Sequence, residues 1–175
     1  SSNLIGDNIL SSGVINYFYN LYPKSKFTFL IGPTASQLYE HFPGLDKTII
    51  IKKKKFNFHW IDMYKNSKNI SWDIVIDLRS SFLSYFLTSK KKYILKKNKK
   101  LHHIEQLNKS FNLNNNIMCV YTSQIEKKEV EENIDINSKH VVIFPGGNWE
   151  PKIWPAENYN ILLKKLEKNF KNIKF

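Results

Sequence analysis

Short apolar runs alternate along this chain with longer segments of helical periodicity. Five runs are typical of β-strands, at residues 26–31, 48–51, 73–78, 117–121 and 140–144. Several of them are continuously apolar, which is the pattern of strands buried on both faces in a parallel sheet. The runs therefore predict a parallel sheet that is covered by helices.

Helical spacing is clearest in residues 7–22, which end before Pro23 and contain an apolar stripe of Ile9, Leu10, Val14, Ile15, Phe18 and Leu21. Further helices are predicted at residues 34–41, 80–88, 104–111 and 156–170. Because strands and helices alternate, the predicted fold class is α/β and Rossmann-like.

The acidic, polar segment 126–139 precedes a fresh apolar strand and is predicted to be a linker. It divides the chain into an N-terminal domain, residues 1–137, and the start of a second domain, residues 138–175. The chain begins at Ser1 without a methionine and stops at Phe175 as a new strand begins. We therefore expect a fragment in which the first domain lacks its first strand and the second is truncated.

Composition sets limits on the class of protein. The chain has 175 residues, of which 42% are hydrophobic, so it can bury a core. Its single cysteine, Cys119, lies in an apolar run, and we expect a buried, inert thiol and a reducing, cytoplasmic compartment. No apolar run approaches the roughly 20 residues that a membrane-spanning helix needs.

The net charge of +12 is concentrated in residues 47–100, which contain 15 basic and three acidic residues. Such a region attracts an anionic membrane surface, an anionic glycolipid or nucleic acid. The lysine blocks lack the interleaved aromatic residues of single-strand binders, so nucleic acid is not the expected partner. A competing interpretation is coding bias, since the chain has one Arg, Arg79, among 27 basic residues.

The first candidate motif is the turn Ile5-Gly6-Asp7, which runs directly into the first predicted helix. Proteins of the α/β class bind ligands at such a helix N-terminus, where free N–H groups and the helix dipole meet. The alternative is that Asp7 only caps the helix. The sequence contains neither the dinucleotide-binding GxGxxG pattern nor a P-loop.

The second candidate motif follows the predicted strand at 140–144 and contains Gly146, Gly147, Asn148 and Lys152. Backbone N–H groups of a Gly-rich loop can hold phosphate oxygens, and a lysine adds a compact positive charge. Pro155 then stands at the start of the next helix, as is common. The alternative is an ordinary connection between a strand and a helix.

Taken together, these segments resemble glycosyltransferase family 9, which includes the ADP-heptose:lipopolysaccharide heptosyltransferases. The resemblance rests on Pro145-Gly146, Lys152 and Trp154-Pro155 in one register, on Gly6-Asp7, and on Asp77-Leu78-Arg79 at a strand end. Three positions depart from the family pattern: Gly13, Leu83 and Asn148. The resemblance implies a GT-B architecture, in which two Rossmann-like domains face each other.

The resemblance also implies a function. It implies an inverting enzyme that transfers a heptose-like sugar from a nucleotide-sugar to a lipopolysaccharide core or related glycan, without a metal or other cofactor. Asp7 would then be the general base, because a sugar hydroxyl is a weak nucleophile until its proton is removed. Gly146, Gly147, Asn148 and Lys152 would bind the donor diphosphate. The fragment alone is expected to be inactive.

On the acceptor side, Gly6 and Arg79 are the expected contacts. A guanidinium group can hold a carboxylate or phosphate through two hydrogen bonds, which lysine cannot do. The alternative for Arg79 is an internal ion pair with Asp77 or another acid. His102 and His103 lack a third ligand at suitable spacing, so no metal site is expected. A sugar- or nucleic-acid-binding module without catalysis remains the alternative function, and peripheral contact with an anionic membrane at its inner, cytoplasmic face is a further expectation.

Overall fold

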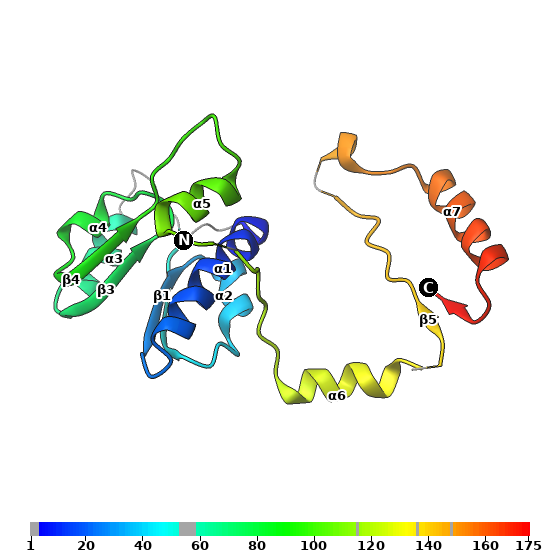
Figure 1. The fold of residues 1–175 in the computed structure, drawn as a ribbon, viewed down its shortest axis with the longest axis horizontal. Helices are drawn as coiled ribbons and strands as arrows, with labels where there is room; N and C mark the ends of the chain where they lie inside the picture. The colour runs from blue at the N-terminus through cyan, green and yellow to red at the C-terminus, as the bar shows by residue number, and fades with distance from the viewer. Residues whose placement is uncertain (1–3, 53–58, 115, 136, 148) are drawn as a thin grey trace. The chain divides into compact units, whose positions relative to one another are not determined.

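The computed structural model describes residues 4–52, 59–114, 116–135, 137–147 and 149–175. The predicted positions Ser1, Lys53–Lys55 and Asn148 therefore lie outside the described residues. Contacts divide the chain into two compact units, residues 1–122 and residues 123–175, and each is described by itself (Figure 1). The domain boundary expected after residue 137 stays a prediction.

Unit 1 alternates helices and strands, as the sequence predicts. In chain order its elements are α1 (Ile5–Leu21), β1 (Phe27–Ile31), α2 (Pro33–Ser36), η1 (Gln37–Tyr39), β2 (Leu45–Ile50), α3 (His59–Ser67), β3 (Trp72–Asp77), α4 (Leu83–Phe86), β4 (Ser89–Ile94) and α5 (His103–Phe111). Strands β1 and β2 form one parallel pair, and β3 and β4 form another.

Side chains of β1 and β3 alternate between two layers of helices. Phe29 and Ile31 of β1 pack in a cluster with Ile15 of α1, whereas Leu30 packs with Met63 of α3. Alternation of this kind is what the two-residue period of a strand produces when both faces are covered.

Strand β3 follows the same rule. Ile76 packs in a cluster with Phe18 of α1, whereas Val75 packs with Leu83 of α4. Helices therefore cover both faces of the strands, and the predicted α/β class with parallel strands is confirmed for unit 1.

Unit 2 is smaller and more open. Its elements are α6 (Gln124–Asn133), β5 (Lys139–His140), η3 (Glu150–Lys152), α7 (Ala156–Asn169) and β6 (Ile173–Lys174). Strands β5 and β6 pair in parallel across α7, which is a βαβ connection. None of the described residues of 123–175 is buried.

The predicted strand at 117–121 is wrong, and the structure gives the reason. This segment is extended but lies along α1, where polar side chains take the place of a neighbouring strand. Cys119 N donates to Ser12 Oγ at 2.8 Å, and the Tyr121 hydroxyl donates to Asn16 Oδ1 at 3.1 Å. Cys119 itself is half-buried rather than buried.

Two further predictions need correction. The strand expected at 140–144 is limited to Lys139–His140, because its described partner β6 is only two residues long. Helix α6 occupies most of the segment 126–139 that was expected to be a linker, and a capping box of Ser123 and Glu126 starts it. Neither α3 nor β4 was predicted from the sequence.

Helices expected at 34–41 and 80–88 form only in part. The first is divided into α2 and η1, and the second is reduced to Leu83–Phe86. Ser80 has φ 55°, in the left-handed region that a helix cannot continue through, so the second helix starts later than its apolar pattern indicates. Within the described residues, no helix combines the length and the apolar character that crossing a bilayer requires.

Candidate functional site

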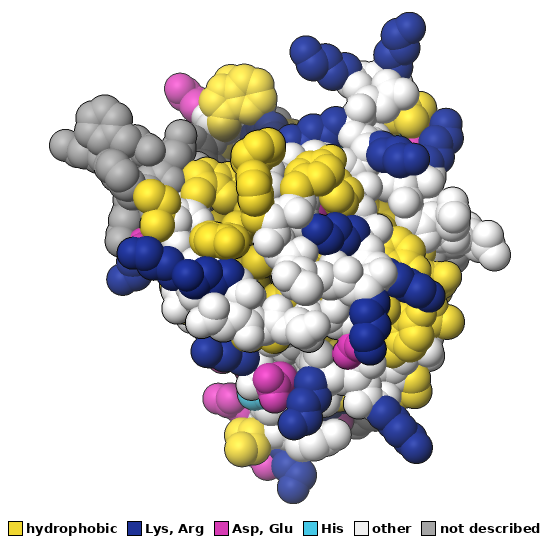
Figure 2. Space-filling view, turned by 90° about the vertical axis from the view of Figure 1, so that its left-hand side faces the viewer, with side chains coloured by type: hydrophobic (Ala, Val, Ile, Leu, Met, Phe, Trp, Pro, Cys, Tyr) yellow, Lys and Arg dark blue, Asp and Glu magenta, His cyan; other side chains and the backbone are white. Residues whose placement is uncertain are grey.

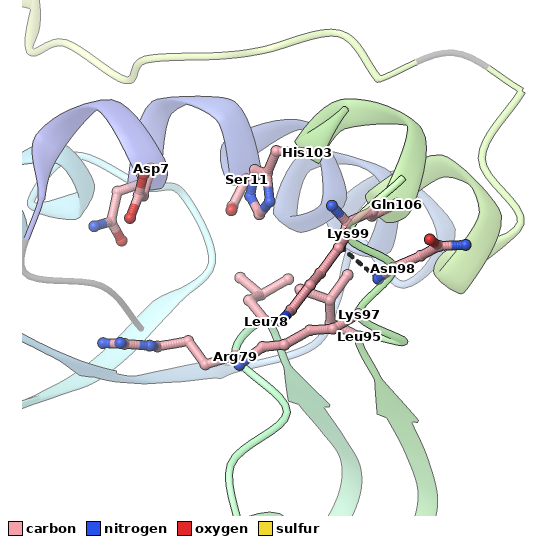
Figure 3. Close-up of a pocket in the computed structure, with 11 residues that line it drawn as sticks. Asp7, Ser11, Leu78, Arg79, Leu95, Lys97, Asn98, Lys99, His103 and Gln106 are labelled. Atoms are coloured by element: carbon pink, nitrogen blue, oxygen red, sulfur yellow. Dashed lines mark hydrogen bonds between the residues drawn. The ribbon is translucent and has the colours of Figure 1, made fainter. Parts of the chain in front are cut away.

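A pocket of about 310 Å³ opens in unit 1 at the carboxyl ends of β3 and β4 (Figure 3). Ligands of open α/β sheets bind at this edge. Three segments line the pocket: the first turns of α1, the loop after β3, and the connection from β4 into α5. The lining residues are Asp7, Asn8, Ser11, Leu78, Arg79, Leu95, Lys97, Asn98, Lys99, His103 and Gln106.

Asp7 lies in the first turn of α1, and its side chain is exposed at the pocket. The suggestion that Asp7 is the N-cap is wrong, because the helix begins at Ile5 and Leu4 is its N-cap. An acidic side chain in the first turn is stabilised by the helix dipole. Gly6, the neighbouring predicted residue, is exposed and does not line the pocket.

The first turns of α1 are held in place by hydrogen bonds to the residue next to Asp7. Asn8 is buried, and its Nδ2 donates to Leu4 O at 2.8 Å. The buried Tyr39 hydroxyl donates to Asn8 O at 3.1 Å. Burial raises the pKa of Tyr39 well above its ordinary value, so the phenol stays protonated and remains a donor. Asp7 therefore projects from a fixed helix turn.

Arg79 is presented by a loop that the buried carboxylate of Asp77 organises. This carboxylate accepts hydrogen bonds from Arg79 N at 2.8 Å, Ser81 N at 2.5 Å and Ser81 Oγ at 2.8 Å. The Ser80 hydroxyl also donates to Leu95 O, which joins the loop to the end of β4. Asp77 thus holds the loop backbone, and the Arg79 side chain is exposed.

The structure brings together Asp7 and Arg79, which belong to separate motifs 72 positions apart in the sequence. Figure 3 shows Arg79 extending along one side of the pocket toward the end where Asp7 lies. Arg79 also lines a smaller cavity of about 60 Å³ beside Gly32, His59 and Trp60. The arginine therefore stands between the two cavities.

Sequence reasoning missed the third wall of the pocket. Lys97 and Lys99 were counted only as part of a charged region, and Gln106 was not considered. The loop that carries the lysines is attached to α5, because Asn98 N donates to Gln106 Oε1 at 3.0 Å and Gln106 Nε2 donates to Leu101 O at 2.9 Å. The lysine side chains are exposed at the pocket.

His103 adds a polar group to the same wall. Within the described residues its Nε2 is buried without a hydrogen-bond partner. Its neighbour His102 is the N-cap of α5, and its side chain accepts a hydrogen bond from Ile104 N. In the part of the chain that the structure describes, no three His, Cys, Asp or Glu side chains are grouped so as to hold a metal ion.

The residues expected to bind the donor lie in unit 2. Gly146 and Gly147 belong to an exposed loop, and Lys152 ends the short helix η3. The Lys152 ammonium lies 5.5 Å from the centroid of the Trp149 ring, a cation–π contact. A Cβ atom at Gly146 would meet no other atom within 4 Å, so the described packing does not itself require glycine there.

Comparisons with known proteins identify the fold. The sequence matches no protein-family model, and no curated protein matches it significantly. The structure is similar to that of a family 9 glycosyltransferase from Veillonella parvula, with a TM-score of 0.68 and 16% identity over 94% of this chain and 57% of that one.

Two structures of the E. coli heptosyltransferase WaaC are also similar. The complex with ADP has a TM-score of 0.64 and 13% identity over 98% of this chain and 64% of that one. The complex with ADP-2-deoxy-2-fluoro heptose has a TM-score of 0.64 and 14% identity, over 98% and 65%. The chain therefore has the fold of part of a family 9 glycosyltransferase, and it spans 57–65% of the length of these proteins.

Proposed function

We propose that this chain provides the acceptor side, and the beginning of the donor side, of an inverting glycosyltransferase. The enzyme transfers a heptose-like sugar from a nucleotide-sugar of the ADP-heptose type to a lipopolysaccharide core or related glycan. One observation carries the proposal: Asp7 and Arg79 line one pocket, at the sheet edge where α/β proteins bind ligands. The fold shared with glycosyltransferases supports it.

In this proposal the acceptor sugar occupies the pocket of unit 1. Asp7 takes the proton of the acceptor hydroxyl while that oxygen forms a bond to the anomeric carbon of the donor. Arg79, Lys97 and Lys99 line the same pocket and hold anionic groups of the acceptor, with Arg79 able to make two parallel hydrogen bonds. Gly6, exposed in the same helix turn as the base, is a further contact for the acceptor.

The donor diphosphate binds at the loop of unit 2. As the bond between the anomeric carbon and the phosphate oxygen breaks, negative charge moves onto the leaving diphosphate. Lys152, Asn148 and the N–H groups of Gly146 and Gly147 stabilise this charge. No metal takes part. The open space around Gly146 supports the assignment, since a phosphate could approach the backbone there. A cytoplasmic location at the inner membrane face belongs to the same proposal.

The test is Asp7→Asn in the product of the complete reading frame. The amide keeps the size of the side chain but cannot accept the proton, so kcat should fall by about 10²- to 10⁴-fold. Asp46→Asn is the matched control, because Asp46 is an exposed acid that pairs with Lys26 at 3.8 Å and does not line the pocket. Steady-state kinetics with a nucleotide-sugar measure both. Near-normal kcat in Asp7→Asn would show that Asp7 is not the base, whereas absence of transfer by the unaltered protein would favour a binding module.

A further inference from the structure

Helices α3 and α4 present large apolar side chains to solvent although they already contribute to the core. Their inner faces supply Met63 and Leu83 to a buried cluster. Their outer faces expose six further large hydrophobic residues: Trp60, Ile61, Tyr64, Phe82, Tyr85 and Phe86. We call these six residues the aromatic surface. Phe82 is 75% exposed and Tyr85 is 63% exposed, so these side chains lie mostly outside the core.

The aromatic residues of α4 and of its N-cap, Phe82, contact one another. The ring centroids of Phe82 and Phe86 lie 4.9 Å apart in an edge-on arrangement, and those of Phe82 and Tyr85 lie 6.4 Å apart. Aromatic pairs of this geometry attract each other only modestly. That attraction is small beside the cost of leaving three large rings in water, so the surface is suited to a partner.

Lysines lie directly against the aromatic surface. Lys92 Nζ donates to Tyr85 O at 3.0 Å, and Lys68 Nζ lies 5.9 Å from the Tyr64 ring centroid. Figure 2 views the side of unit 1 that carries α3, α4 and β4, and it shows hydrophobic side chains gathered there with Lys side chains near them. Lys65 stands in the last turn of α3.

Acidic groups on these elements do not cancel the positive charge. Asp62 lies in the first turn of α3, and Asp73 of β3 is paired with Lys90 at 2.6 Å. Lys65, Lys68 and Lys92 remain as further cations, so positive charge exceeds negative charge around the rings. An anionic partner is therefore favoured over a neutral one.

We propose that the aromatic surface is where this protein docks on an anionic lipid bilayer. Trp, Tyr and Phe side chains enter the interface between headgroups and acyl chains, where amphipathic rings are stable. Lys65, Lys68 and Lys92 contact the lipid phosphates, and each lysine near an anionic surface contributes about 1 kcal/mol, or about fivefold in affinity.

The position of Trp60 connects this surface to the proposed reaction. Trp60 lines the small cavity together with Arg79, and Arg79 also lines the pocket of Asp7. Docking through Trp60 thus brings the acceptor pocket close to the bilayer, where a lipid-linked glycan would be found. This link rests on the proposed function, whereas the docking itself does not.

Two double variants of the chain test the docking on vesicles of equal parts phosphatidylglycerol and phosphatidylcholine. Lys65→Gln with Lys92→Gln should weaken binding about 30-fold at low salt, and less at high salt. Phe82→Ser with Phe86→Ser should weaken it by about tenfold or more at any salt concentration. Lys164→Gln with Lys168→Gln, on α7, is the matched charge control and should bind as the wild type does. Melting curves must match throughout.

A measurement of how deeply Trp60 enters the bilayer distinguishes docking through the rings from electrostatic attraction alone. Brominated lipids should quench the tryptophan fluorescence of the wild type, and Trp60→Phe should lose most of that quenching. The proposal is overturned if the aromatic variant binds normally, if the α7 control loses as much as the other lysine variant, or if Phe82→Ser abolishes a dimer in sedimentation without changing vesicle binding. Vesicle binding by this chain, together with no sugar transfer by the product of the complete reading frame, would contradict only the proposed function.

Discussion

The two units of this chain reach very different levels of burial. Unit 1 has three clusters of buried hydrophobic side chains, and residues from both layers of helices meet the strands. The described part of unit 2 has regular helices and a parallel strand pair but no buried residue. Secondary structure alone therefore does not make a stable domain, because most of the stability of a helix comes from packing its apolar face.

The largest expected effect concerns separation of the two units. A chain of residues 1–122 should fold by itself, since its clusters are internal, whereas a chain of residues 123–175 should not. Circular dichroism and amide hydrogen exchange measure this directly. Cooperative melting of the 123–175 peptide would contradict the prediction that this unit does not fold by itself. The same lack of a packed donor side leads us to expect no sugar transfer by the 175-residue chain alone.

A matched pair of substitutions tests the difference in burial between the two units at single residues. Phe18 is 2% exposed at the centre of unit 1, and Phe18→Ala should destabilise folding by about 3–5 kcal/mol. Phe144 is 84% exposed in unit 2, and Phe144→Ala should change stability by less than about 0.5 kcal/mol. Denaturant titration of both variants gives the two free energies. Equal losses would mean that Phe144 packs in solution.

Lys152 tests whether the open loop of unit 2 has a function. In the product of the complete reading frame, Lys152→Ala should remove a charge-assisted contact and weaken nucleoside-diphosphate binding by about 10- to 150-fold. The melting temperature should hardly change, because the lysine is exposed. Calorimetric titration measures the affinity, with Lys164→Ala on α7 as control. Unchanged affinity would mean that Lys152 does not bind the diphosphate and only contacts Trp149.

The smallest effect is expected at Asp135, where unit 2 has local order. Hydrogen bonds from Ser138, from Asn137 N and from Lys174 Nζ lower the pKa of the Asp135 carboxyl to about 2. A lowered pKa in the folded state stabilises the fold above the ordinary pKa of about 4, and this contribution is lost as pH falls through about 2.

NMR titration of the Asp135 carboxyl carbon measures this pKa. Ser138→Ala should move the pKa upward, toward its ordinary value, because it removes the strongest of these hydrogen bonds. Lys164→Ala should leave it unchanged. An ordinary pKa in the wild type would mean that the hydrogen bonds to Asp135, above all that from Ser138, are absent in solution.

The elements predicted well from sequence are those whose periodicity matches their burial. The stripe in residues 7–22 became α1, and the apolar runs at 26–31 and 73–78 became β1 and β3. Strand β4 was not predicted, because Lys90, Lys91 and Lys92 hide its pattern. It forms because β3 supplies its hydrogen bonds, which is a property of the fold and not of the local sequence.

Residues 117–121 show the opposite error. Their apolar composition is that of a buried strand, yet their polar partners are side chains of α1. The residues of the site also fall into those that the sequence indicates and those that it does not. Asp7 and Arg79 stood out through motifs, whereas Lys97 and Gln106 reach the pocket only because of how two loops fold. The capping box at Ser123 and Glu126 was visible in the sequence and would have predicted α6.

The close contact between α1 and the extended segment after α5 depends on Gly13. A Cβ atom at Gly13 would collide with the Asn116 side chain and lie 2.9 Å from Ile117 O, so only glycine lets the segment approach this closely. Asn116 Nδ2 also donates to Leu10 O at 3.2 Å. The segment leads into unit 2 at Ser123. The last stretch of unit 1 before Ser123 is therefore anchored to α1, the helix that carries Asp7, and this anchoring depends on the missing side chain at position 13.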